Sequence, residues 1–429
     1  MKQINFPNRE DWNSLCLRPV QEQQELSNII KEVFATVARE GDAGLLQYTQ
    51  RYDHPEAVKI IDMPLDDSVT AIPAELKDAI RIAKNNISKF HSTQIERPVK
   101  TDTMPGVTCW RESRPIDRIG IYIPGGSAPL FSTVLMLAIP AQLAGCRDVI
   151  LCTPPDRNGS INPAILYAAN ITGVSKVFAV GGAQAIAAMA IGTATIPRVD
   201  KIFGPGNQYV TAAKTYAQQL GTAIDMPAGP SEVLIIADEY ADAAFVAADI
   251  LSQAEHGADS QAILLSDNAI IINKVLFELN TQLSQLPRKA IAEQALNNSK
   301  AILLNNLDEC IEFSNQYAPE HLIITTENAE QLAGKVSNAG SVFLGRYSCE
   351  SAGDYASGPN HTLPTNGYAR SYSGVSVDSF VKKITFQRIT AEGISNIGPA
   401  IETLATAEGL IAHKEAVTIR LNALKNIKK

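Results

Sequence analysis

The sequence lacks the patterns that mark several classes of protein. Its six cysteines show no C-x-x-C spacing and are too sparse for a disulfide scaffold, so we expect reduced thiols. No stretch is long and apolar enough to span a bilayer, and the N-terminus has no apolar signal-peptide core. There is no arginine-rich patch, and a formal net charge of −8 would repel nucleic acid and anionic membranes. We therefore expect a cytoplasmic protein that binds neither nucleic acid nor membrane.

The length and the first hundred residues predict a multidomain protein with a helical beginning. A chain of 429 residues is too long for one compact core, so two or more domains are expected. Apolar residues recur at helical spacing over Ser27–Arg39, Ala43–Tyr52 and Pro73–His91. Gly41 separates the first two helices, and Pro73 stands near the start of the third, where its missing N–H costs nothing. We interpret this region as scaffold.

Between residues 118 and 220 the pattern alternates between strand, glycine-rich turn and helix. The strands are predicted at Ile119–Ile123, Asp148–Thr153, Val174–Val180 and Asp200–Phe203. Three of them run into glycine-rich turns, which begin at Pro124, Gly181 and Gly204. Such alternation predicts a parallel sheet whose turns lie at the carboxyl edge, where these sheets bind ligands.

The glycine-rich turns do not form the usual dinucleotide fingerprint. None of them is G-x-G-x-x-G, and no acidic residue follows at the required distance. Their glycines would let backbone N–H groups approach a phosphate, but tight packing of helix on strand would need them as well. The turns alone therefore leave nucleotide binding open.

A second βα series follows the hinge-like segment Pro227–Ser231. Its strands are predicted at Glu232–Ala237, Gln261–Ser266, Lys300–Leu304, His321–Thr325 and Ser341–Leu344. A long loop over Arg346–Gly374 comes next, and helices over Ala391–Ala407 and Ile411–Lys425 end the chain. The apolar faces of this tail need a surface to cover, either a homodimer partner or the second sheet. The cleft between the two sheets is the expected site.

Several polar residues stand where chemistry is plausible. Gln253 and His256 are three residues apart near the end of a helix that begins near Ala241, so they would share a face. Only six histidines occur, and His321, His361 and His413 stand near carboxylates or glycine-rich turns. Such contexts suggest a functional site. The alternatives are a solvated helix end for Gln253 and His256 and an exposed strand edge for Glu320-His321.

The residue types indicate a divalent metal beside an acid–base pair. Gln253, His256, Asp354 and His413 offer nitrogen and oxygen ligands without sulfur, a set that suits Zn²⁺. The dipeptide Glu320-His321 supplies a carboxylate and an imidazole, which a reaction with an activated water would use.

Long motifs of the chain resemble those of L-histidinol dehydrogenases. The signature is similar over Ile224–Ala237 followed by Ser252–His256, and the likeness runs from about residue 12 to about residue 425. Further similar motifs are Tyr122–Val134, Gly181–Ala188, Phe203–Asn207, Pro319–Ile323, Ser351–Gly358 and Ala412–Lys414.

The resemblance implies a role for individual residues. It assigns one Zn²⁺ per subunit to Gln253, His256, Asp354 and His413, the set proposed above from residue types. It makes Glu320 and His321 the catalytic pair. NAD⁺ would contact Tyr122, Gln184 and Asn207. The substrate would contact the metal ligands, the catalytic pair, and three further residues, Ser231, His361 and Glu408.

The resemblance also implies an α/β fold with two Rossmann-like parallel-sheet domains, a helical N-terminal segment and a helical C-terminal tail. The expected parts are an N-terminal arm (1–20), a first Rossmann-like domain with the metal and catalytic residues (21–121 plus 232–375), an NAD-binding second one (122–231), and a dimerisation tail (376–429). The implied assembly is an intertwined homodimer whose active sites are shared between chains.

The implied reaction ends histidine biosynthesis. L-Histidinol is oxidised through L-histidinaldehyde to L-histidine, and two NAD⁺ are reduced. The principal alternative from the residues is a zinc-dependent hydrolase acting on a small amine or amide, which would not need NAD⁺. A cysteine-dependent aldehyde dehydrogenase and a non-catalytic metal-binding protein are further alternatives.

Overall fold

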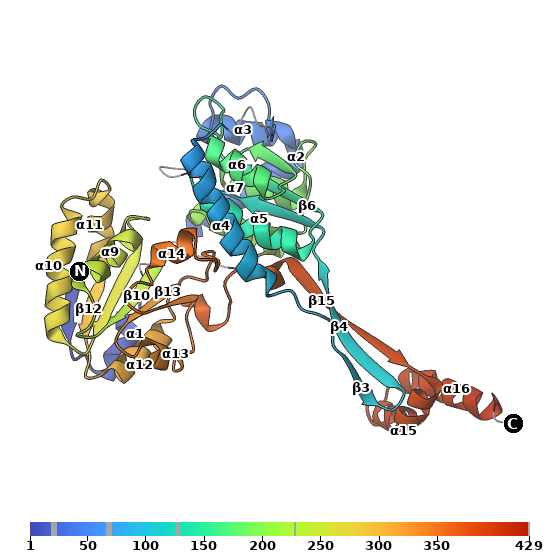
Figure 1. Ribbon diagram of the computed structural model, residues 1–429. Coiled ribbons are helices and arrows are strands. Elements are labelled where there is room, and N and C mark those ends of the chain that lie inside the picture. Colours follow the sequence, from blue (N-terminus) through green and yellow to red (C-terminus); the bar gives the residue numbers. More distant parts are fainter. Residues whose placement is uncertain (19–23, 66–70, 126–128, 227–228, 428–429) are drawn as a thin grey trace. The chain divides into compact units, whose positions relative to one another are not determined.

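The computed structural model describes residues 1–18, 24–65, 71–125, 129–226 and 229–427 (Figure 1). These residues form two compact units. Unit 1 comprises Met1–Gln94 and Ile116–Ser379, and unit 2 comprises Ile95–Pro115 and Phe380–Lys429. Parts of the predicted turn at 124–127 and of the hinge at 227–231 lie outside the described residues. Within the described part of the chain, no helix has the length and apolarity needed to cross a bilayer.

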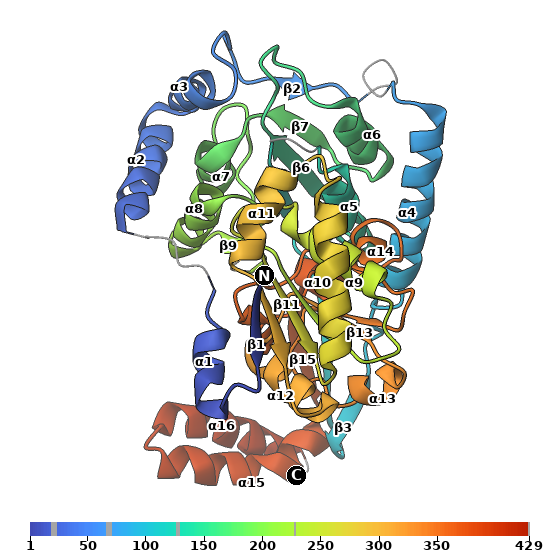
Figure 2. The same ribbon diagram turned by 90° about the vertical axis from the view of Figure 1, so that its left-hand side faces the viewer.

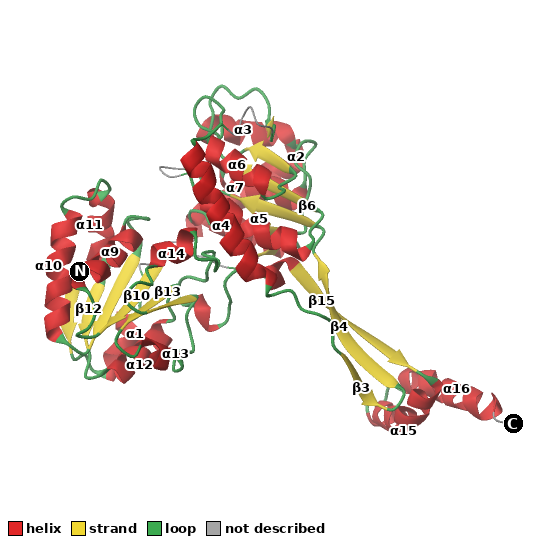
Figure 3. Cartoon of the chain, in the orientation of Figure 1, coloured by secondary structure: helices red, strands yellow, loops and turns green. Residues whose placement is uncertain are grey.

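Unit 1 contains a six-stranded parallel sheet, called sheet A (Figure 3). Its order is β1 (Lys2–Asn5), β12 (Lys300–Leu303), β11 (Gln261–Ser266), β10 (Glu232–Ala237), β13 (His321–Thr325) and β14 (Ser341–Leu344). Every residue of β10, β11 and β13 is buried, as continuous apolar runs predict for strands covered on both faces.

Helices cover both faces of sheet A (Figure 2). Val233 and Ile235 pack against α9 (Ala243–Ala254), α10 (Ala269–Leu283) and α11 (Lys289–Asn297). Leu234 and Ile236 point the other way, as the alternation of a strand requires. That second face is covered by α1 (Trp12–Leu15), α12 (Leu307–Tyr317) and α13 (Ala329–Ala333), next to a short 3-10 turn η1 (Arg9–Asp11).

Sheet B is the second six-stranded sheet of unit 1. Its order is β2 (Asp62–Met63), β7 (Lys176–Ala179), β6 (Asp148–Thr153), β5 (Arg118–Tyr122), β8 (Lys201–Phe203) and β9 (Ala223–Ile224). Only β2 is antiparallel to its neighbour. The crossover helices are α5 (Phe131–Ala144), α6 (Pro163–Ile171), α7 (Gly182–Ile191) and α8 (Gln208–Gln219). The expected α/β fold with two parallel-stranded sheets is confirmed.

The N-terminal helices belong with sheet B, which differs from the expected boundaries. Helix α2 (Gln24–Glu40) packs on α7 and α8, α3 (Asp42–Tyr52) packs on α7, and α4 (Ala74–Ser92) packs on α5. The sequence-based division had joined 21–121 to 232–375 and had treated 1–20 as an arm, whereas β1 pairs with β12 in sheet A. Helical periodicity identifies the buried face of α2, but not the surface against which that face packs.

The segment after β14 is less irregular than the expected loop over 346–374. It contains α14 (Glu350–Tyr355) and two 3-10 turns, η2 (Tyr368–Arg370) and η3 (Val377–Phe380). Helix α14 is short, and glycine and serine around it hide its signal in the sequence.

Unit 2 is a three-stranded antiparallel sheet followed by two helices. The sheet order is β15 (Val381–Ile389), β4 (Val107–Pro115) and β3 (Lys100–Met104), and the helices are α15 (Ala391–Ala407) and α16 (Ile411–Ile427). The helices predicted at 391–407 and 411–425 are present as α15 and α16, and β15, which was not predicted, precedes them within 376–429. All residues of β3 and β15 are exposed or half-buried, so the strands lack the apolar alternation that would reveal them.

Candidate active site

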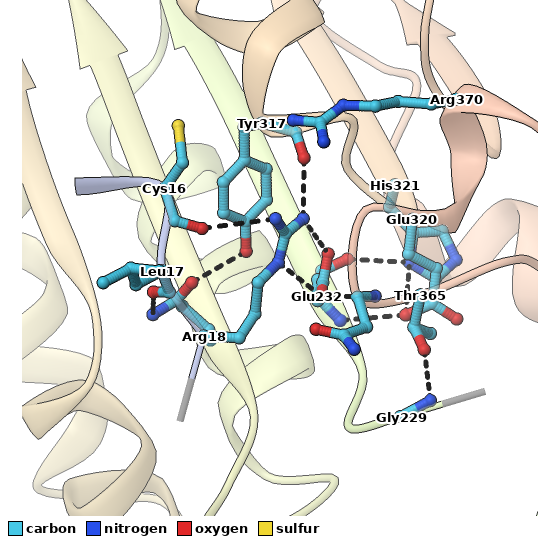
Figure 4. A network of polar contacts seen from close by, with 12 residues as sticks. Cys16, Leu17, Arg18, Gly229, Glu232, Tyr317, Glu320, His321, Thr365 and Arg370 are labelled. Carbon is cyan, nitrogen blue, oxygen red and sulfur yellow. Dashed lines mark hydrogen bonds and ion pairs between the residues drawn. The ribbon is translucent and has the colours of Figure 1, made fainter. Parts of the chain in front are cut away.

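The predicted catalytic pair lies at the amino-terminal edge of sheet A. Ser231 immediately precedes β10, Glu320 precedes β13, and His321 is the first residue of β13. Because β10 and β13 are parallel neighbours with Val233 opposite His321, their starts lie side by side (Figure 4). This edge is opposite to the carboxyl edge at which parallel sheets usually bind ligands.

Hydrogen bonds to the backbone of Glu232 fix both catalytic side chains. The Glu232 N–H donates to Oε2 of Glu320 at 2.8 Å. Nδ1 of His321 lies 3.3 Å from the Glu232 carbonyl oxygen, which can only accept, so Nδ1 carries the proton of the neutral ring. Nε2 of His321 is buried and has no hydrogen-bond partner among the described residues. This tautomer leaves Nε2 free to accept a proton.

Burial sets the ionisation of the catalytic pair. It lowers the pKa of His321 to about 4, although the nearby Asp354 carboxylate opposes the shift. The imidazole is therefore neutral at physiological pH, as a general base must be. Burial raises the pKa of Glu320 well above its ordinary value, and the hydrogen bond from the Glu232 N–H opposes this shift.

Gln253 and His256 reach the same edge because α9 runs back from the carboxyl ends of the strands. Gln253 lies in the last turn of α9, is fully buried, and has neither amide atom hydrogen-bonded within the described residues. The helix ends at Ala254, so exposed His256 lies just beyond it, with its N–H donating to the Gln253 carbonyl at 3.3 Å. The amide atoms of Gln253 are therefore available to a ligand.

Helix α14 brings carboxylates to this group. His256, Glu350 and Asp354 each offer one ligand atom, and these atoms lie within 4.8 Å of one another. Oδ1 of Asp354 is 3.7 Å from Nε2 of His321. His361 donates from Nδ1 to the Asp354 carbonyl at 2.8 Å, while its Nε2 is 3.0 Å from Oγ1 of Thr133. The structure thus brings His256 and Asp354, two of the four predicted metal ligands, together with the catalytic pair and His361, and Gln253 stands three residues before His256.

Glu350 is a site residue that the sequence did not reveal. It is almost fully buried, and neither carboxylate oxygen has a hydrogen-bond partner among the described residues. Its Oε1 lies 3.8 Å from Nδ1 of His321, and burial raises its pKa well above the ordinary value. The signal available in the sequence was its spacing, since Glu350 stands four residues before Asp354 and so shares one helix face with it.

The three residues expected to contact NAD⁺ lie at the carboxyl ends of strands in sheet B. The Tyr122 hydroxyl accepts from the Gly182 N–H at 3.0 Å, and Gln184 donates to Oδ2 of Asp53 at 3.2 Å. Asn207 caps α8 by accepting from the N–H groups of Tyr209 and Val210. Each side chain therefore also has a local structural role.

Sheet B carries a cavity of about 580 Å³ beyond the carboxyl ends of β5 and β6. Pro124, Gly125, Thr153 and Asn162 are among its lining residues. Within the described part of the chain, none of the three expected NAD⁺ residues lines it. The cavity lies at the edge where parallel sheets bind ligands.

One glycine-rich turn serves backbone packing. Gly204 has a φ of +125°, and a Cβ there would lie 2.0 Å from the carbonyl oxygen of Tyr122. Only glycine fits this position. The same turn therefore holds β8 close to the end of β5, beside the cavity.

The remaining two expected site residues belong to unit 2. Glu408 follows the last turn of α15, His413 lies in the first turn of α16, and both are exposed. The roles of these two residues stay predictions.

Comparison with known proteins identifies the family. The sequence matches the family model described as Histidinol dehydrogenase over residues 16–421. The histidinol dehydrogenase of Bacteroides fragilis is 55% identical over 427 residues, 99% of this chain and 100% of that protein. That of Vibrio vulnificus is 50% identical over 417 residues, 96% of each chain. The crystal structure of histidinol dehydrogenase from Elizabethkingia anophelis shows 58% identity and a TM-score of 0.97 over 99% of both chains. The chain belongs to the histidinol dehydrogenase family.

Membership of the histidinol dehydrogenase family confirms the resemblance carried by the motifs. It makes the protein a NAD-dependent oxidoreductase of histidine biosynthesis. An acetylating aldehyde dehydrogenase from Geobacillus thermoglucosidasius is also similar in structure, with a TM-score of 0.50 and 16% identity over 88% of this chain and 94% of that one. That likeness shows a shared fold alone.

Two buried cysteines of this histidinol dehydrogenase family member lack the properties of an activated nucleophile. Cys152 lies in β6 and is fully buried, and burial raises the pKa of its thiol. Cys310 in α12 is likewise buried with a raised pKa. A nucleophilic cysteine requires a lowered pKa, which these thiols do not have.

Proposed function

We propose that the protein oxidises L-histidinol to L-histidine through L-histidinaldehyde, with reduction of two NAD⁺, in the last steps of histidine biosynthesis. The observation that carries this proposal is the buried neutral imidazole of His321 beside the carboxyl of Glu320, with His256 and Asp354, two ligands suited to zinc, close by. A base and a water-activating group are what the two oxidations need.

His321 would act as the base of the first oxidation. An alcohol does not release its proton unaided at neutral pH, so hydride departure requires a proton acceptor. The free Nε2 of His321 takes the hydroxyl proton while the carbinol carbon gives its hydride to NAD⁺. The products are the aldehyde, NADH and a protonated His321, which then returns its proton to solvent.

Glu320 would act in the second oxidation, after the aldehyde forms. Water must add to the aldehyde before a second hydride can leave, and Glu320 accepts a proton from that water. Burial raises the pKa of Glu320, which makes its ionised form a stronger base than an exposed carboxylate. His321 then accepts the hydroxyl proton of the hydrate as its hydride goes to a second NAD⁺. The products are L-histidine and NADH.

Gln253, His256 and Asp354, with His413, would hold one Zn²⁺ per subunit. The fit is supported by the unsatisfied buried carboxamide of Gln253 and by the closeness of the His256 and Asp354 ligand atoms. Nitrogen and oxygen donors without sulfur suit this ion. Bound there, zinc would supply positioning of the imidazole and amino nitrogens of the substrate. Ser231 and His361 would contact the substrate from the same edge.

We place NAD⁺ at sheet B and the second half of the site in a partner chain. Tyr122, Gln184 and Asn207 lie at the carboxyl ends of β5, β7 and β8, where open parallel sheets bind nucleotides. The tail over 376–429 would join two chains in a homodimer, so that Glu408 and His413 complete the partner's site. A cytoplasmic location suits a biosynthetic enzyme whose six cysteines are too scattered for a disulfide scaffold.

The proposal is tested by following NADH absorbance after L-histidinol and NAD⁺ are mixed with the protein. We expect two NADH per histidinol consumed and L-histidine as the product. Chelation with EDTA should abolish the signal, and added Zn²⁺ should restore it. Hydrolysis of a small amide without NADH would instead support the zinc hydrolase, and full activity of a protein shown to be metal-free would refute the role of zinc.

A further inference from the structure

A buried ion pair joins the N-terminal segment to the first residue of β10. Nε and Nη2 of Arg18 donate to the two carboxylate oxygens of Glu232, each at 2.9 Å (Figure 4). The side chains are 12% and 1% exposed, so the pair is largely shielded from water. The guanidinium also lies 3.7 Å from the centre of the Tyr317 ring and donates to the Tyr317 carbonyl at 2.7 Å. Arg18 is therefore held in one orientation.

The same carboxylate fixes the loop that follows α14. The Asn366 N–H donates to Oε1 of Glu232 at 2.7 Å, and the adjacent Thr365 hydroxyl accepts from the Gly229 N–H. Three segments that are distant in sequence thus converge on Glu232. The Glu232 side chain is held by Arg18 of the N-terminal segment and by Asn366 of the loop, while its backbone belongs to β10.

The main chain of Glu232 touches both residues of the proposed catalytic pair. Its N–H holds the carboxylate of Glu320 at 2.8 Å, and its carbonyl holds Nδ1 of His321 at 3.3 Å. The residue that anchors Arg18 thus also sets the direction of the Glu320 carboxylate and the tautomer of His321. Both contacts come from this one residue.

We propose that Arg18 and Glu232 are a positioning pair that aligns Glu320 and His321 for proton transfer. The inference rests on the roles proposed above for these two residues. A buried pair is poorly explained by stability, since apolar side chains of similar size serve that purpose as well or better. A bidentate pair does fix direction, because the planar fork of arginine matches a carboxylate in one geometry.

The first test replaces Arg18 with lysine, which keeps the charge but loses the fork. We expect the first-turnover rate of NADH formation from histidinol to fall about 10-fold to 100-fold, since a small misplacement of reacting groups has effects of that size. KM for NAD⁺ should stay within about two-fold because sheet B is untouched. Arg370→Lys is the matched control, since exposed Arg370 lies nearby and donates to the Gln316 carbonyl instead of Glu232. It should behave as wild type.

A double-variant comparison separates positioning from simple support of the fold. In a His321→Gln background the base is already lost, so Arg18→Lys should lower the remaining rate by less than about two-fold. A loss of the same factor in both backgrounds would overturn the proposal and indicate general damage. If His321→Gln itself turned over at the wild-type rate, the role of His321 would be wrong, and the positioning role with it.

A charge-free variant keeps the test decisive if Arg18→Lys folds poorly. Arg18→Met combined with Glu232→Gln removes both charges, so no buried charge is left alone. We expect this protein to melt near the wild-type temperature. Its first-turnover rate of NADH formation should still fall as in Arg18→Lys. A wild-type rate in the charge-free variant would overturn the proposal.

Discussion

At the scale of single residues, His321 owes its proposed role to its surroundings. The Glu232 carbonyl accepts a hydrogen bond from Nδ1 of His321, Asp354 lies 3.7 Å from its Nε2, and burial favours the neutral ring. The dipeptide Glu320-His321 could be singled out from the sequence as an acid–base pair. The ionisation of His321 could not be predicted from the sequence, because its lowered pKa depends on burial by residues far away in the chain.

The first prediction concerns the pH dependence of alcohol oxidation. The base is active when His321 is neutral, and its pKa is lowered from 6.5 to about 4, so activity should be lost only as the pH falls well below 6.5. The measurement is the single-turnover rate of NADH formation at saturating histidinol, which avoids titration of the free substrate. Circular dichroism at each pH controls for acid unfolding. A rate that halves at or above pH 6.5 would contradict this ionisation.

The second prediction divides the two half-reactions. Glu320→Gln should slow oxidation of L-histidinaldehyde by roughly 100-fold or more, because only that step needs an activated water. Oxidation of L-histidinol by the same variant should fall much less. Single-turnover measurements of each half-reaction, with exposed Glu330→Gln as the control, check this. Equal losses in both would remove Glu320 from its assigned role.

At the scale of elements, the site depends on strand starts and helix ends. The start of β13 carries the catalytic pair, the start of β10 carries Glu232, which holds both side chains, and the end of α9 carries Gln253. These elements were predictable from apolar runs and helical spacing. That these elements lie at one edge could not be predicted, because β10 and β13 are far apart in the sequence and become neighbours only in sheet A. Strands β3 and β15 were missed since few of their side chains are buried.

The third prediction separates the two roles of Asn207 at the start of α8. Asn207→Ser keeps a side-chain oxygen that can cap the helix, so the melting temperature should stay near wild type. The variant loses the amide, so KM for NAD⁺ should rise several-fold if that amide contacts the cofactor. Asn207→Ala should show the same rise and also lose about 1 kcal/mol of stability. An unchanged KM in both variants would leave Asn207 as a helix cap only.

At the scale of the whole molecule, two parallel-stranded sheets share unit 1, and a small antiparallel sheet with two helices forms unit 2. Two sheets and a helical end were predictable from βα alternation and from the periodicity of 391–425. The division between the two units could not be predicted, since unit 2 joins residues 95–115 to the tail through pairing of β4 with β15. Within a single chain, Glu408 and His413 stand in a different unit from the catalytic pair.

The central claim is that the catalytic site is complete only when a second chain supplies Glu408 and His413. The direct measurement mixes His256→Ala and His413→Ala proteins, unfolds and refolds them together, and assays NADH formation. In a shared arrangement each mixed dimer has one site with both defects and one with neither, so random reassortment predicts about a quarter of wild-type activity. Each variant refolded alone is the control and should be inactive. Activity that stays near zero in the mixture would show that His413 serves the site of its own chain and would contradict the claim.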